Sequence, residues 1–148
     1  MTNKEFVLQT MRQNGRTAAL DLQNRSSDMN GTQLNAESDY IPDFTSAKAV
    51  NNMLNRSVGF VCKSSAGRVV KLLQPYDSTI FTAEPEELPA QWGLVWSTDP
   101  AKALPFVAMS TSPYMIGDCC TENDKTYKSK IDNNVWSPSS YLAGWEEV

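Results

Sequence analysis

An α+β fold is predicted for this chain of 148 residues, with N-terminal helices, a central antiparallel β-hairpin and a small C-terminal all-β module rich in aromatic residues. Three observations predict it. Apolar residues recur at helical spacing near the N-terminus, follow a strand pattern from Val58, and give way to large aromatic rings among short strand and turn signals from Tyr114. We divide the chain into residues 1–110, a helix and hairpin region, and residues 111–148, the β module.

The first helix is predicted near the N-terminus. Thr2 and Glu5 have the spacing of a capping box, in which each side chain accepts a hydrogen bond from the other residue's backbone amide. Gly15 either ends this helix or bends it, because residues 17–22 contain alanines and leucines that would continue a helical face. The apolar side chains expected along one side of the helix are Phe6, Val7, Leu8 and Met11.

The next part of the chain is predicted as a long loop followed by a second helix. Residues 23–38 are poor in apolar side chains and rich in Asn, Ser and Asp, which favours a loop. Residues 44–54 suit a helix whose propensity is only moderate, because several Asn, Ser and Thr side chains compete for backbone hydrogen bonds. Packing must therefore stabilise this helix through an apolar side that we expect at Phe44, Ala47, Val50 and Leu54.

A β-hairpin is predicted in the middle of the chain. Residues 58–62 and 68–73 are rich in Val and Leu, and they flank a polar segment that ends in Gly67, a residue able to adopt positive φ. Pro75 ends the second strand because proline lacks a backbone donor. Residues 84–89 then form an acidic connector bounded by prolines, and Trp92 and Trp96 that follow are expected in the core or at a protein interface.

The C-terminal module is predicted to consist of short strands and tight turns. Residues 119–121 and 126–129 suit the two strands of a hairpin with a polar turn between them, and residues 132–134 suit a further turn. So short a segment cannot bury a large aliphatic core, so aromatic rings and prolines are expected to supply the packing. The rings are Tyr114, Tyr127, Trp136, Tyr141 and Trp145.

Composition excludes several classes of function. The net charge of −4, without a basic run, argues against a nucleic-acid partner. No apolar run is long enough to span a membrane, and the N-terminus lacks the apolar core of a signal peptide, so we expect no membrane partner and no secretion signal. The absence of histidine removes the commonest general base and every Ser-His or Cys-His pair.

Two acidic groups are candidate sites of chemistry. Glu84, Glu86 and Glu87 could form a paired-carboxylate site of the glycosidase type, but a solvated charge run on a flexible connector explains them better. Asp118, Glu122, Asp124 and Asp132, together with Asn133 and Asn134, could bind calcium, yet they lack the spacing of a metal loop and suit tight turns. We therefore expect no catalytic residue, no metal and no cofactor, and we expect the three cysteines to be reduced and partly buried.

The aromatic residues of the module are the candidates for binding. Sugar rings present apolar C–H faces that stack on Trp and Tyr, while their hydroxyl groups bond to nearby polar side chains. The alternative for each ring is a place in the core, which carries more weight for Trp136 and equal weight for Tyr141 and Trp145. The candidate carbohydrate-binding residues are Trp136, Tyr141, Trp145, Asp132 and Asn134.

A family resemblance rests on the same residues. Tyr114, Gly117-Asp118, Tyr127 and Ser129 are followed by the closely spaced run Asp132-x-Asn134-x-Trp136-Ser137-Pro138-x-x-Tyr141, and by Ala143-Gly144-Trp145. This pattern resembles the small chitin-binding-type carbohydrate-binding modules of families five and twelve, and in particular the variants at the ends of phage and prophage tail proteins. The resemblance covers about a quarter of the chain and is most specific from residue 131 to the end.

The resemblance implies a non-enzymatic accessory protein of a phage or prophage tail or baseplate, whose module binds cell-surface or cell-wall polysaccharide. Residues 1–110 would be the region that docks on the particle, and the other partners would be tail proteins and further copies of the chain within that particle. It would be located in the virion and made in the host cytoplasm without a signal peptide. Two alternatives stay open. One is a purely structural virion assembly protein, favoured by Leu142, where members often carry proline; the other is an accessory fragment of a glycan hydrolase.

Overall fold

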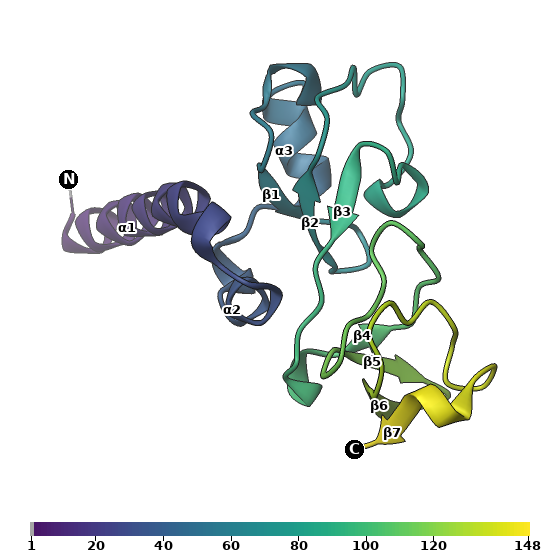
Figure 1. Ribbon diagram of the computed structural model, residues 1–148. Coiled ribbons are helices and arrows are strands. Elements are labelled where there is room, and N and C mark those ends of the chain that lie inside the picture. The colour runs from purple at the N-terminus through teal and green to yellow at the C-terminus, as the bar shows by residue number, and fades with distance from the viewer. Residues whose placement is uncertain (1) are drawn as a thin grey trace.

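The computed structural model describes residues 2–148 and contains a helical N-terminal part and two small β-sheets, which confirms the α+β class (Figure 1). The first sheet has the strand order β1-β2-β3 and the second has the order β4-β5-β6-β7. Short 3₁₀ helices connect several elements. The helices are α1 (Asn3–Arg25), α2 (Gly31–Ala36) and α3 (Phe44–Val50), and the strands are β1 (Val61–Lys63), β2 (Val69–Leu72), β3 (Trp92–Leu94), β4 (Leu104–Pro105), β5 (Cys119–Glu122), β6 (Lys125–Ser129) and β7 (Trp145–Glu147).

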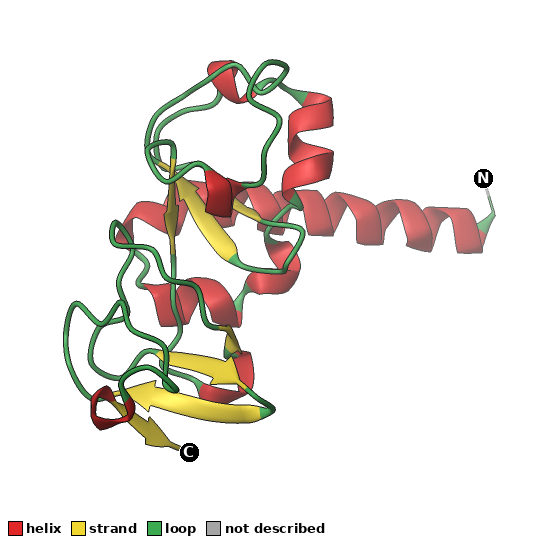
Figure 2. Ribbon diagram, turned by 90° about the vertical axis from the view of Figure 1, so that its right-hand side faces the viewer, coloured by secondary structure: helices red, strands yellow, loops and turns green. Residues whose placement is uncertain are grey.

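Helix α1 begins at the predicted capping box. The Glu5 backbone amide donates to the Thr2 hydroxyl at 3.1 Å, and the Thr2 amide donates to the Glu5 carboxylate at 2.8 Å. Gly15 does not end the helix, which continues to Arg25. Leu22 is its one buried residue, and the N-terminal half of α1 extends away from the rest of the molecule (Figures 1 and 2). The predicted apolar stripe is therefore not part of the core.

The predicted loop between residues 23 and 38 is wrong, because this segment contains helix α2. Asn30 and Gln33 form a second capping box, and Leu34 is fully buried in a cluster with Leu22 and Ile41. Gly31 allows α2 to approach the backbone that follows β3, since a Cβ at this position would lie 2.0 Å from the Trp96 carbonyl oxygen. The buried Leu34 and the capping box stabilise this helix, although the polar composition of the segment predicts a loop.

Helix α3 is shorter than predicted. Phe44 and Ala47 are buried as expected, but the helix ends at Val50, and Val50 and Leu54 are exposed. Asn52 explains the ending: its side-chain oxygen accepts hydrogen bonds from the amides of Leu54 and Ser78, and its amide donates to Asp77. These bonds compete with helical geometry at this position.

The first sheet contains the predicted hairpin. Strands β1 and β2 pair antiparallel with Cys62 opposite Val70, and Gly67 has the positive φ of +82° that the turn requires. Side chains alternate across the sheet, so each face meets a different cluster. Val61 and Val69 face Leu22, Leu34 and Ile41 at the root of α1 and at α2.

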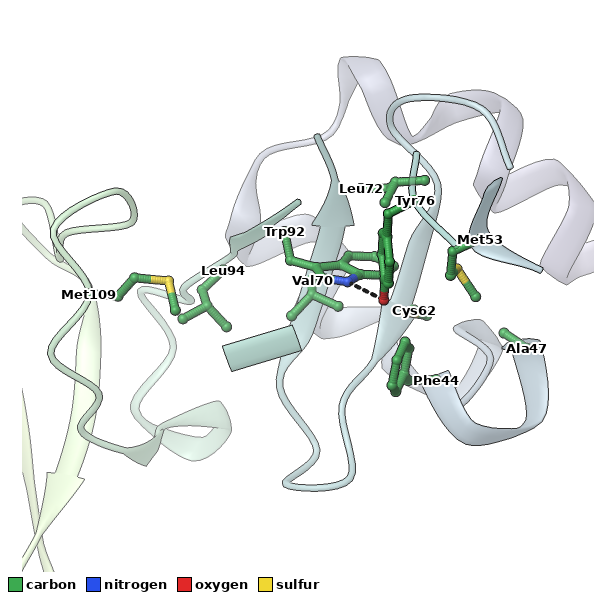
Figure 3. Close-up of a cluster of buried hydrophobic side chains, with 10 residues drawn as sticks. All are labelled: Phe44, Ala47, Met53, Cys62, Val70, Leu72, Tyr76, Trp92, Leu94 and Met109. Atoms are coloured by element: carbon green, nitrogen blue, oxygen red, sulfur yellow. Dashed lines mark hydrogen bonds between the residues drawn. The ribbon is translucent and has the colours of Figure 1, made fainter. Parts of the chain in front are cut away.

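The opposite face of the first sheet holds the largest core, shown in Figure 3. Trp92 is fully buried, its indole nitrogen donates to the Tyr76 hydroxyl at 2.9 Å, and Phe44 meets it edge-on at 5.8 Å. Of the two places that the sequence allowed for Trp92, the core and a protein interface, the structure shows the core. The cluster consists of Phe44, Ala47, Met53, Cys62, Val70, Leu72, Tyr76, Trp92, Leu94 and Met109.

The second sheet contains the predicted C-terminal hairpin. Strands β5 and β6 are joined at Asn123 and Asp124, whose φ values of 52° and 63° are typical of a tight hairpin turn. Strand β4 pairs parallel with β5, with Leu104 opposite Cys120. The sheet therefore includes residues that precede the boundary we placed at residue 111.

Aromatic rings form the core beside the second sheet, as the sequence predicts. Tyr114 is buried and stacks on Trp96 at 4.2 Å and on Phe106 at 5.3 Å, while Trp145 meets Tyr114 edge-on at 5.3 Å. Trp96 also packs against the core of the first sheet, so it joins the two units. Within residues 2–148 no helix has both the length and the apolar sequence needed to cross a lipid bilayer.

Candidate carbohydrate-binding surface

Two of the predicted binding residues form an exposed aromatic pair between β6 and β7. Trp136 is 49% exposed and Tyr141 is 41% exposed. Their ring centroids are 5.6 Å apart and the ring planes meet at 85°. Each ring is therefore partly held by its neighbour and partly open to solvent, which is the arrangement that stacking on a sugar ring requires.

Backbone hydrogen bonds fix the loop that carries the pair. The Tyr141 amide donates to the Ser137 carbonyl at 2.9 Å, and the Gly144 amide donates to the Tyr141 carbonyl at 3.1 Å. The Trp145 indole nitrogen donates to the Trp136 carbonyl at 2.8 Å. The two rings consequently sit on an ordered turn, and binding would cost little conformational entropy.

The structure removes Trp145 from the ligand-contacting set. Its side chain is only 4% exposed because Tyr114 and Phe106 cover it within the aromatic cluster. Its burial leaves no ring face for a sugar. Trp145 instead stabilises the loop that carries Trp136 and Tyr141, because its indole nitrogen donates to the Trp136 carbonyl.

Asn134 is also a supporting residue and not a ligand contact. It has no exposed surface, and its amide donates to the Ser129 hydroxyl at 3.1 Å and to the Gly144 carbonyl at 3.2 Å. Its side-chain oxygen accepts from the Trp136 amide at 3.3 Å. One buried amide thus ties the start and the end of the loop to β6, and its hydrogen-bonding capacity is used within the chain.

Asp132 is exposed, but it is occupied in holding a turn. Its carboxylate accepts a hydrogen bond from the Ile116 backbone amide at 3.0 Å. The neighbouring Asn133 has a positive φ of 54°, which Asn tolerates better than most residues. Asp132 therefore keeps one carboxylate oxygen free for a ligand while the other joins the turn to the segment before β5.

The serines beside the pair were missed by reasoning from the sequence. The Ser137 hydroxyl lies 3.2 Å from that of Ser139 and 2.9 Å from that of Ser140, and the Ser139 amide donates to Glu122 at 2.9 Å. Ser139 and Ser140 are exposed. The signal was present in the run Ser137-Pro138-Ser139-Ser140, which places hydroxyl groups between the two exposed rings. Such hydroxyls suit the polar edge of a sugar.

A shallow depression of about 420 Å³ adjoins this serine turn. Glu122 lies at its rim and connects it to Ser139 through the hydrogen bond just described. The lining comes from the β5–β6 hairpin and from β4, and it exposes somewhat more apolar than polar surface. Its residues are Pro105, Thr121, Glu122, Asn123, Asp124 and Thr126. An open surface of this kind suits an extended polysaccharide better than a small enclosed ligand.

The acidic candidates for chemistry have structural partners. Glu86 forms an ion pair of 2.9 Å with Arg68, and both side chains are largely buried, so the expectation of a solvated charge run is wrong for Glu86. Glu84 accepts from the Ser65 amide at 2.8 Å, and Glu87 is exposed. The Glu86–Arg68 ion pair and the hydrogen bond from the Ser65 amide to Glu84 both connect residues 84–89 to the β1–β2 hairpin. Within residues 2–148 no group of three or more His, Cys, Asp or Glu side chains could hold a metal ion.

Asp118, which lies before β5, is a partly buried carboxylate near the site. Burial raises the pKa of Asp118 above its usual value, and the negative charge of Asp132 acts in the same direction, while a hydrogen bond from the Met115 amide opposes both.

The cysteines are free and buried. Burial raises the pKa of Cys120 to about 12, so its thiolate is scarce at neutral pH and the thiol is inert.

Comparisons with known proteins identify no relative of this chain. No protein-family model matches the chain, and no curated protein or solved structure matches it at the significance threshold.

Proposed function

We propose that this protein is a non-enzymatic accessory protein of a phage or prophage tail or baseplate, and that its C-terminal part binds cell-surface or cell-wall carbohydrate. The observation that carries the binding proposal is the exposed pair Trp136 and Tyr141 on an ordered turn. The resemblance of residues 114–148 to chitin-binding-type modules supports the link to phage tails. The protein would be made in the host cytoplasm and assembled into the virion.

The two rings suit a polysaccharide because they present apolar surface next to hydroxyl groups. A pyranose C–H face would cover the exposed part of Trp136, and its hydroxyls would reach Ser139 and Ser140. Such an open surface buries little area, so each site would be weak. A particle that carries many copies would gain affinity through simultaneous attachment to one cell wall.

The proposal is tested by retention on insoluble chitin, peptidoglycan and host cell wall. We expect Trp136→Ala and Tyr141→Ala each to weaken retention by about fivefold, since one aromatic contact contributes about 1 kcal/mol. Phe81→Ala is the matched control, because Phe81 is 56% exposed and lies outside the site. Equal retention of all three variants on every glycan would overturn the proposal. Release of reducing sugar by the wild-type protein would instead favour the hydrolase alternative.

A purely structural role in virion assembly is the second candidate. It is favoured by the apolar residues Phe6, Val7 and Met11, each more than half exposed on the extended half of α1. Exposed apolar side chains gathered on one segment are typical of a surface that another protein covers. Stoichiometric incorporation into particles without retention on any glycan would support this candidate over carbohydrate binding.

A further inference from the structure

Two adjoining depressions lie where the C-terminal end of helix α1 meets the segment between α3 and β1. Their volumes are about 530 and 250 Å³, and they share Leu20, Gln23, Arg56 and Phe60. The larger volume falls within the roughly 300–1,000 Å³ that is typical of pockets for small ligands. All lining residues lie between positions 19 and 60, so the depressions are separate from the aromatic pair of the C-terminal part.

Hydrogen bonds fix the walls of both depressions. The Gln23 side chain pairs with the Val61 backbone, donating to its carbonyl at 2.7 Å and accepting from its amide at 3.0 Å, which ties α1 to β1. The Ser26 hydroxyl donates to the Gln23 carbonyl at 2.9 Å. On the other side, the Arg56 guanidinium donates to the Ala47 carbonyl of α3 at 2.9 Å. A ligand would therefore meet preformed walls and would lose little affinity to ordering them.

Arg56 is the one charged side chain among the described residues that line the depressions. It is partly buried, and its guanidinium carbon lies 4.4 Å from the centre of the Phe60 ring. Of its five N–H donors one bonds to Ala47, and the buried Nε has no partner within residues 2–148. Arg56 forms no ion pair in that part of the chain either. Because a cation removed from water costs free energy unless an opposite charge compensates it, this position favours an anionic ligand.

A second cation adds to the positive charge at this place. The Lys71 ammonium donates to the Ser26 carbonyl at 3.1 Å, and Ser26 lines the larger depression. Lys71 has no carboxylate within ion-pair distance among the residues that the structure describes. Of the acidic residues near the end of α1, Asp21 pairs with Arg25 at 2.8 Å and Asp28 is exposed, and neither lines the depressions. Although the chain is acidic overall, its charges favour an anion here.

The other lining side chains indicate what the anion is attached to. Amide and hydroxyl groups surround the larger depression, and such groups both donate and accept hydrogen bonds, which suits the hydroxyls of a sugar. They belong to Asn24, Ser26, Ser27, Asn51, Asn55 and Ser57. The smaller depression is mostly apolar and gives a place to an apolar substituent such as an acetyl group. Its apolar lining consists of Ala19, Leu20, Pro42, Ala47, Val50 and Phe60.

We propose that these depressions bind a sugar unit that carries a carboxylate or phosphate group. The anion lies at the Arg56 guanidinium, and the sugar hydroxyls lie against the amide and hydroxyl side chains of the larger depression. A fatty acid also carries an anion, but its hydrocarbon chain would cover these polar groups without replacing their hydrogen bonds to water. The inference is independent of the aromatic surface, since it uses no residue from 111–148.

Titration of the full chain, followed through the amide signals of an NMR spectrum, tests the ligand class. The probes are N-acetylmuramic acid and N-acetylglucosamine, which share the ring and the acetyl group and differ by a lactyl carboxylate. We expect the acid to bind with a Kd of about 1 mM and the neutral sugar at least about tenfold more weakly. N-acetylglucosamine 6-phosphate distinguishes a phosphate from a carboxylate. The proposal is wrong if neither acidic sugar binds more tightly than N-acetylglucosamine, or if acetate alone binds as tightly as they do.

Variants test the place of binding. Ser57→Glu and Ser57→Gln are a matched pair, because both enlarge an exposed lining residue and they differ in charge. We expect Ser57→Glu to raise the Kd for the acidic sugar about tenfold and Ser57→Gln to change it less than about threefold. Arg56→Gln should raise it about thirtyfold, with circular dichroism as the check of folding. Trp136→Ala should leave it unchanged. Equal effects of the two Ser57 variants, or loss of binding in Trp136→Ala with full binding in Arg56→Gln, would overturn the proposal.

Discussion

Asn134 shows how a buried polar residue can shape a binding surface without touching the ligand. Its amide and carbonyl join β6, Trp136 and Gly144, and its backbone pairs with that of Tyr114 through two hydrogen bonds of 2.9 and 2.8 Å. The exposed ring of Trp136 therefore depends on a side chain that no solvent reaches. Removing that side chain leaves several polar groups without partners in a buried place.

We predict that Asn134→Ala lowers the free energy of unfolding by about 2 kcal/mol, because the loss of its hydrogen bonds is not compensated by water. Urea denaturation measures this change. Asn55→Ala is the control, since Asn55 is exposed and makes one weak hydrogen bond of 3.4 Å, and it should change stability by less than about 0.5 kcal/mol. Equal effects of the two substitutions would show that Asn134 does not hold the loop.

Asp118 should make stability depend on pH. Its folded pKa is raised, first by burial and then by Asp132, so the folded state holds the proton more tightly than the unfolded state does. This group therefore favours folding as pH falls toward the usual aspartate pKa of 3.8, and that contribution is lost as pH rises through the folded pKa.

Asp118→Asn should remove this dependence while its side-chain oxygen still accepts from the Met115 amide. The stability of the variant relative to the wild type should then be greater at pH 7 than at pH 4, as measured by urea denaturation at both values. A constant difference across this range would mean that the Asp118 carboxyl has the same pKa in the folded and unfolded states.

At the scale of elements, two glycines in helices have opposite consequences. A Cβ at Gly31 would lie 2.0 Å from the Trp96 carbonyl oxygen and 2.8 Å from Val95, whereas a Cβ at Gly15 would meet nothing within 4 Å. Gly31 therefore allows α2 to approach the chain that follows β3. Gly15 lies in the exposed N-terminal part of α1, where glycine makes the helix less stable than alanine would.

We predict that Gly31→Ala destabilises the protein by about 1–3 kcal/mol, because the backbone must shift to relieve the contact. Gly15→Ala should raise the helicity of α1 and stabilise it by up to about 1 kcal/mol. Circular dichroism and thermal denaturation measure both changes, and each variant serves as the control for the other. Two effects of the same sign would contradict the different surroundings of the two glycines.

Local signals predicted the start of α1 and the turns of both hairpins, although the capping box of α2 at Asn30 and Gln33 was missed. The capping box at Thr2, the positive φ at Gly67 and the turn at Asn123 and Asp124 depend on neighbouring residues alone. The predicted extension of α3 to residue 54 was wrong: the helix ends at Val50 because Asn52 bonds to Asp77 and Ser78, which lie far along the sequence. Contacts of that kind leave no periodic pattern.

At the scale of the whole molecule, the two sheets depend on each other. Trp96 packs against the cores of both, and its indole nitrogen donates to the Ser112 carbonyl at 2.9 Å, while the Ser112 hydroxyl accepts from the Leu94 amide. Phe106 and β4 also belong to the second sheet unit although they precede residue 111. The second sheet and its core therefore extend across the domain boundary that the sequence suggested at residue 111.

We predict that a fragment of residues 111–148 does not fold alone, because it lacks Trp96, Phe106 and strand β4. So small a unit depends on every large side chain of its core. The dispersion of amide signals in an NMR spectrum tests this. The full chain should unfold in one thermal transition, and a dispersed spectrum of the fragment or a second transition would show two independent domains.

The amino-acid sequence by itself determined the α+β class, both hairpins, the cap of α1 and the identity of the aromatic residues in the C-terminal part, because these follow from local backbone preferences and composition. Only the tertiary structure decided which rings are exposed. Trp145 is covered by Tyr114 and Phe106, whereas Trp136 and Tyr141 stay open, and no spacing rule separates them. The physical reason is that the burial of a ring depends on its neighbours in space, and many of these neighbours lie far away in the sequence.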